Sequence, residues 1–168
     1  MNNTIRIKPH HFIDIITSFA VDKVLLEPHP YGHNVYSVSK KILTDRNVVL
    51  EIELHDDDIC SPCIHNINGI CDDTIDTANR PQAPTLKREW NLLIDNRWCE
   101  RLKIKHGDKI SALKFCELIN ENTNNILEIY KEVNKEHTVN RELNLRKGLK
   151  KYLASNVEFV DNRTIGRS

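Results

Sequence analysis

Glycine and proline are both scarce, with 5 glycines and 6 prolines among 168 residues. This excludes collagen-like and mucin-like proteins and long flexible linkers. Long hydrophobic runs are also absent, because no apolar stretch approaches the roughly 20 residues that a membrane-spanning helix needs. The N-terminal segment MNNTIRIKPHHF has polar residues, a proline and two histidines before any apolar stretch, unlike a signal peptide. We therefore expect a soluble, cytoplasmic protein of one domain without membrane association.

The net charge gives no support to nucleic-acid binding, because 24 Lys and Arg balance 24 Asp and Glu. The balance conceals an uneven distribution. Residues 1–80 hold seven basic and twelve acidic residues, a net charge of −5, and the remainder carries +5. The acidic excess surrounds a group of cysteines, and no Lys or Arg lies between Arg46 and Arg80. This pattern is typical either of a solvated acidic loop or of an anionic environment for a cation.

The spacing of apolar residues predicts a mainly helical α+β domain over residues 1–155, with a small strand component and an irregular cysteine-bearing loop. Alternation predicts strands at 4–8 and 48–54. Helical spacing predicts helices at 9–20, 34–44, 85–102, 111–119 and 126–133, and a last one marked by Leu143 to Leu153. Residues 156–168 lack periodicity and are predicted to be a frayed tail.

Five cysteines are unusual for a protein expected in the reducing cytoplasm, where disulfides are rare. Three of them form a C-x2-C-x7-C pattern, at Cys60, Cys63 and Cys71. Two thiolates three residues apart can reach one metal from a tight turn, and Gly69 allows the chain to return toward them. Such a group is typical of an iron–sulfur cluster or of zinc. Cys99 and Cys116 lie in apolar helical patterns and are expected in the core.

The cysteine group is one ligand short of the four that such metal sites commonly use. The candidates for an additional or flanking ligand are His10, His11, Asp14 and His65. Adjacent helical residues point about 100° apart, so we expect the rings of His10 and His11 to face different sides. Carboxylates beside a cluster lower its reduction potential, which makes Asp57 and Asp58 candidate cofactor-binding residues.

Two segments, IRIKPHHFIDI near the start and DDICSPC…NGIC in the middle, resemble the prokaryotic domain of unknown function family 1284. The order of the segments and the helix–turn–helix pattern after them also fit, over about residues 5–119. The resemblance implies a small cytosolic domain that binds an iron–sulfur cluster or another metal. The residues that match the family's motifs are Pro9, His10, His11, Asp57, Asp58, Cys60, Cys63 and Cys71.

The chain departs from the family's pattern in two ways. Asp14 stands where the family has a cysteine, and the family's late C-x-x-C-Glu-Trp segment has no counterpart here. The first hypothesis is an iron–sulfur protein with a redox, sensing or cluster-based catalytic role and an unknown redox or protein partner. The alternatives are a structural zinc module that binds a protein partner, and a degenerate member without metal. No nucleotide-binding or catalytic-triad motif indicates an enzyme class.

Overall fold

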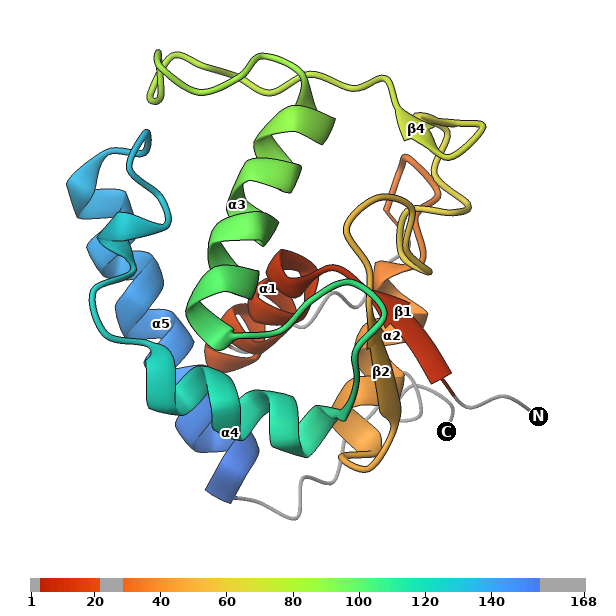
Figure 1. Ribbon diagram of the computed structural model, residues 1–168, viewed down its shortest axis with the longest axis vertical. Coiled ribbons are helices and arrows are strands. Elements are labelled where there is room, and N and C mark those ends of the chain that lie inside the picture. Colours follow the sequence, from red (N-terminus) through yellow and green to blue (C-terminus); the bar gives the residue numbers. More distant parts are fainter. Residues whose placement is uncertain (1–3, 22–28, 155–168) are drawn as a thin grey trace, which may run out of the picture.

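The computed structural model describes residues 4–21 and 29–154, and this part of the chain confirms a mainly helical α+β fold (Figure 1). Its elements are β1 (Thr4–Ile7), α1 (Pro9–Ala20), α2 (Val35–Thr44), β2 (Val49–Ile52), β3 (Asn66–Ile67), β4 (Ile70–Cys71), α3 (Lys87–Leu102), β5 (Lys109–Ser111), α4 (Ala112–Asn122), the 3-10 turn η1 (Ile126–Glu128) and α5 (Lys135–Ala154). The tail predicted at 156–168 lies outside the described residues. Among the helices described, none has the length and apolar character needed to cross a membrane.

A small sheet has the strand order β1-β2-β5, with β1 parallel and β5 antiparallel to the central β2. Alternation gives β1 and β2 one buried face each, and the register sets Ile5 opposite Leu50 and Ile7 opposite Ile52. These apolar pairs fix the register, because a slip by one residue would turn them toward solvent. The sequence did not indicate β5, because its three residues are too few to show alternation.

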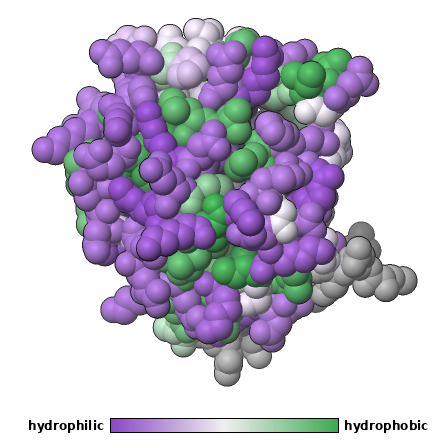
Figure 2. All heavy atoms as spheres, viewed as in Figure 1, coloured by the Kyte–Doolittle hydropathy of each residue, from purple (hydrophilic) through white to green (hydrophobic). Residues whose placement is uncertain are grey.

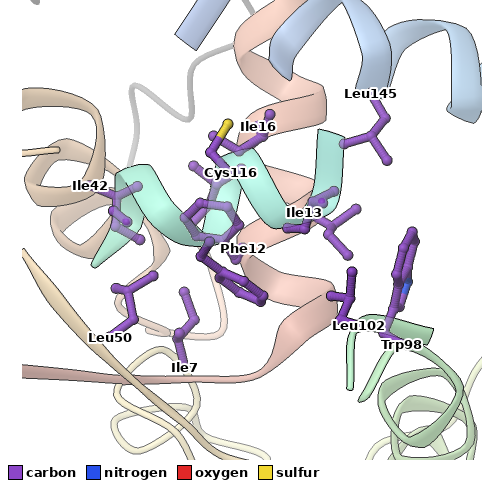
Figure 3. Packing of buried hydrophobic residues seen from close by; sticks show 14 of the residues in the cluster. Ile7, Phe12, Ile13, Ile16, Ile42, Leu50, Trp98, Leu102, Cys116 and Leu145 are labelled. Atoms are coloured by element: carbon purple, nitrogen blue, oxygen red, sulfur yellow. The ribbon is translucent and has the colours of Figure 1, made fainter. Parts of the chain in front are cut away.

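Helix α1 packs mainly against α5 and also against α3, and α4 packs against both α5 and α3 (Figure 1). Side chains of α1, β2, α4 and α5 meet in the core, where Figure 3 shows Phe12, Ile16 and Leu145 among the buried residues. Gly148 is the point of closest approach: a methyl group there would lie 2.8 Å from the carbonyl carbon of Ile16, and closer still to the carbonyl oxygen. The outer surface in Figure 2 is mostly hydrophilic, with apolar residues visible near its centre.

One expectation for the C-terminal third is wrong. In place of the helix predicted at 126–133, the structure has only the short 3-10 turn η1. Asn125, the residue before this turn, has a positive φ of 55°. Its apolar spacing instead reflects burial of the turn against the core. The last helix contains Leu143 to Leu153, as expected, and begins at Lys135, where Asn134 caps it by accepting a hydrogen bond from the Glu136 amide. Its first turns are mostly exposed, so they carry no apolar stripe from which to predict them.

The cysteine-bearing loop is irregular, as expected, except for the hairpin of β3 and β4. The two strands are joined by Asn68 and Gly69, which have φ values of 53° and 82°. Positive φ at both central residues is the signature of a type I′ turn, for which Asn-Gly is the favoured pair. The Asn-Gly dipeptide is therefore the feature of the sequence that indicates this hairpin.

Candidate metal centre

The candidate site lies where two parallel neighbours, β1 and β2, end. Lys8 and His11 follow β1 directly, and Asp57 and Cys60 lie in the loop after β2. Because the carboxyl ends of parallel strands meet at one edge of a sheet, the topology brings these segments together although His11 and Asp57 are 46 residues apart. The sheet therefore assembles the site from two distant parts of the chain.

Asp57 is the centre of this arrangement and is fully buried. Its carboxylate lies 2.6 Å from His11 Nδ1 and accepts hydrogen bonds from the backbone amides of Lys8, at 3.0 Å, and Cys60, at 2.9 Å. Burial alone would raise the pKa of this carboxyl, but His11 and Lys8 hold it well below its usual range. Asp57 is therefore ionised and fixes the relative positions of both segments.

His11, Asp57 and Cys60 each offer a ligand atom, and these three atoms lie within 4.8 Å of one another. Lys8 Nζ donates a hydrogen bond to Cys60 Sγ at 3.3 Å. Burial lowers the pKa of His11 against the attraction of Asp57, which favours the neutral imidazole. Burial and the Asp57 charge raise the pKa of the Cys60 thiol to about 12, against the effect of Lys8. The group thus contains one nitrogen, one oxygen and one sulfur donor.

The donor set fits zinc in kind, since zinc accepts imidazole, carboxylate and thiolate ligands. Zinc bonds of about 2.1 Å at a tetrahedral angle would hold a nitrogen and an oxygen about 3.4 Å apart. His11 Nδ1 and Asp57 Oδ2 are closer than this: they lie 2.6 Å apart, as expected when a proton lies between them in a hydrogen bond. An ion between them must therefore displace that proton and widen the contact by about 0.8 Å.

His10 belongs to a second, parallel pair. Asp95 of α3 is fully buried and accepts hydrogen bonds from the His10 backbone amide, at 2.8 Å, and from Nδ1, at 2.7 Å. Burial opposes protonation, yet the charge and the hydrogen bond of Asp95 raise the pKa of His10 above its usual value. Asp95 had one signal in the sequence: it is an acidic residue in the apolar stripe that continues through Trp98 and Leu102.

The rings of His10 and His11 do not face different sides, so that expectation is wrong. Their centroids are 4.2 Å apart, and both residues line one cavity. The reason is that each ring, in the first turn of α1, contacts its own buried carboxylate. His10 pairs with Asp95, and His11 pairs with Asp57. With Nδ1 engaged in each case, neither Nε2 has a hydrogen-bond partner among residues 4–21 and 29–154.

Cys63 and Cys71 do not join the group of ligand atoms around Cys60 in the described part of the chain. The Cys63 amide donates to the Cys60 carbonyl at 2.9 Å, so a tight turn links the first two cysteines as the C-x-x-C spacing indicates. Cys71 lies in β4, paired with Asn66 of β3. Cys63 and Cys71 are both partly exposed, whereas Cys99 and Cys116 are buried in the core as expected.

The other predicted residues have partners of their own. His65 Nδ1 lies 2.8 Å from Asp72, and Asp14 forms an ion pair with Arg141 of α5 at 2.7 Å. Asp58 accepts a hydrogen bond from the backbone amide of Arg6. Neither His65, Asp14 nor Asp58 contributes to the grouped ligand atoms of the described chain. Two residues beside the site were not among the predicted ones: Lys8, which donates to Cys60, and Asp95, which accepts from His10.

Comparisons with protein-family models, curated proteins and solved structures find no match to this chain. The likeness to domain of unknown function family 1284 therefore stays a prediction from the residues of its two segments.

Proposed function

We propose that the protein binds one divalent transition-metal ion, zinc, through His11, Asp57 and Cys60. The observation that supports this is the convergence of three different ligand types within 4.8 Å, from two segments that only the fold brings together. Zinc suits such a mixed set, and three protein ligands with a fourth position open are typical of catalytic zinc sites. Bound there, the ion would supply Lewis acidity toward a ligand in the adjoining cavity.

The charge states of the side chains support a ligand role. His11 is neutral and Asp57 ionised, so once an ion displaces the proton between them, Nδ1 and the carboxylate both offer lone pairs to it. Cys60 is a thiol at neutral pH, because its pKa is raised to about 12, and this disfavours a role as a free nucleophile. A coordinating cation deprotonates a thiol outright, so the same raised pKa is compatible with a ligand. Lys8 stabilises the resulting thiolate through its hydrogen bond to Sγ.

The iron–sulfur cluster is the second candidate, and the tight turn between Cys60 and Cys63 favours it. The two candidates require different cysteines. A cluster uses Cys60, Cys63 and Cys71 together, whereas the single ion uses Cys60 alone. Cys63 and Cys71 are therefore matched controls for Cys60 on the same loop.

The experiment is metal analysis of the protein purified without oxygen, together with the single variants Cys60→Ser, Cys63→Ser and Cys71→Ser. We expect a colourless wild type with one zinc per chain, no bound zinc in Cys60→Ser, and full zinc content in the other two variants. A brown wild type with iron and sulfide, lost in all three variants, would support the cluster instead. Wild-type protein that is folded and takes up neither metal would refute both candidates and favour a metal-free member.

A further inference from the structure

A cavity of about 900 Å³ adjoins the candidate metal centre. Its walls come from α1, α3 and α5 and from the loop that precedes α3, and His10 and His11 lie in the wall formed by α1. The volume falls in the range of about 300–1,000 Å³ that small-molecule sites occupy. A cavity of this size beside two imidazoles can hold a small organic ligand.

Three cationic side chains line the cavity, and they differ in their partners. Arg141 is paired with Asp14 at 2.7 Å, and Lys87 with Asp73 at 2.8 Å. Arg80 forms no ion pair among the described residues. Its Nε donates to the backbone carbonyl of Asp76, whose side chain also lines the cavity, and its guanidinium lies 5.4 Å from the ring centre of Trp90. The Arg80 charge thus lies beside an aromatic ring, and its terminal nitrogens make no hydrogen bond to the part of the chain that the structure describes.

Neutral polar groups in the same walls are also without partners. Asn91 of α3 and Asn144 of α5 are half-buried, and neither side-chain amide makes a hydrogen bond within the described ranges. His33 Nδ1 is buried and has no hydrogen-bond partner there either. Burial lowers the pKa of His33 to about 4, so its ring is neutral at pH 7. A buried polar group normally has a partner, so the unpaired His33 Nδ1, beside two side-chain amides free to bind a ligand, favours a polar occupant of the cavity.

We propose that this cavity binds a small organic anion, whose carboxylate or phosphate group is held by Arg80 on the Trp90 ring. A guanidinium presents paired N–H donors whose spacing matches a carboxylate or a phosphate, which a lysine does not provide. The amides of Asn91 and Asn144 then contact the polar body of the molecule. This site rests on the cavity itself and does not require a bound metal ion.

The test is a titration followed by nuclear magnetic resonance of the two indole N–H groups. Trp90 borders the cavity, whereas the Trp98 indole is buried and donates to Tyr130, which makes it an internal reference. The probes are succinate, inorganic phosphate and the uncharged succinamide. We expect one or both anions to shift the Trp90 signal saturably and more than the Trp98 signal, and succinamide to have no effect. The tighter-binding anion identifies the preferred group.

Arg80→Gln should weaken anion binding about tenfold or more, because it removes charged hydrogen bonds. Arg80→Lys should bind the anion with intermediate affinity, since lysine keeps the positive charge but lacks the paired N–H donors of a guanidinium. Arg88→Gln is the matched control: Arg88 is exposed on α3, contacts the Cys71 carbonyl and does not line the cavity. The affinity of Arg88→Gln for the anion should equal that of the wild type.

The proposal is overturned if neither anion shifts the Trp90 signal saturably up to about 50 mM, which corresponds to very weak affinity. It is also overturned if succinamide binds as well as succinate, or if folded Arg80→Gln retains wild-type affinity. Titrations on protein as purified and after metal removal separate the two proposals. Anion binding that persists without metal supports the cavity site whatever the outcome of the metal analysis.

Discussion

Replacement of Gly148 by alanine should destabilise the protein, although helix propensity alone predicts the opposite. Gly148 lies in the interior of α5, where alanine is favoured over glycine by about 1 kcal/mol. The added methyl group would lie within 3.0 Å of the Ile16 carbonyl group, a separation that real Cβ atoms essentially never show. Since the obstacle is backbone, no side-chain rotation relieves it, and α1 and α5 must move apart. Overpacking of this kind costs about 3 kcal/mol or more, which leaves a net loss of about 2 kcal/mol.

Urea unfolding of Gly148→Ala, followed by circular dichroism, measures this loss. Lys147→Ala is the matched control, because residue 147 is an exposed neighbour on α5 and its substitution should change the stability by less than about 0.5 kcal/mol. A Gly148→Ala variant more stable than the wild type by about 1 kcal/mol would mean that propensity outweighs the contact. In that case α1 and α5 would not approach as closely as described.

Three further outcomes are expected. The Arg97 hydrogen bond lowers the pKa of Glu132, so its stabilisation is present above the unfolded pKa and lost as the pH falls through the folded pKa. Unfolding free energies from pH 7 to 3 should therefore decrease less in Glu132→Gln. Asp95→Ala should lower the stability by about 3 kcal/mol in urea unfolding, because two buried donors of His10 lose their acceptor. Zinc at 100 times its dissociation constant should stabilise the wild type by about 2.7 kcal/mol in a thermal melt, and leave Cys60→Ser unchanged.

The sequence predicted most of the fold wherever a regular pattern carried it. The strand at Thr4–Ile7 and the helices that start at Pro9 and Val35 were found because alternation and helical spacing are complete within each. The helix predicted from 111 is α4, and the Ser111 hydroxyl caps it by accepting from the Lys114 amide. The predictions failed where contacts distant in sequence decide the structure. The residues 126–133 have helical spacing, but the core and the adjoining α5 restrict them to one turn.

The candidate site was predicted only in part, for a physical reason. Spacing along the chain indicated Cys60 and the residues around it, because ligands within one short loop have a recognisable spacing in the sequence. It could not show that His11 meets Asp57, since that contact depends on the parallel pairing of β1 and β2. It also could not show that Cys71 would be committed to a hairpin strand beside Asn66. The metal hypothesis stays a proposal, now with a different set of partners for Cys60.

The parallel pairing of β1 with β2 has a consequence for the order of folding. The two strands are joined through α1, α2 and residues 22–28, so a long loop must close before they meet. Contacts of this kind form late, after local helices, because the chain loses the entropy of loop closure before the contacts can stabilise it. The hydrogen bond between His11 and Asp57 should therefore be absent from the folding transition state. A nascent or partly folded chain would not yet have desolvated this carboxylate, so tight metal capture would be confined to molecules that have completed their sheet.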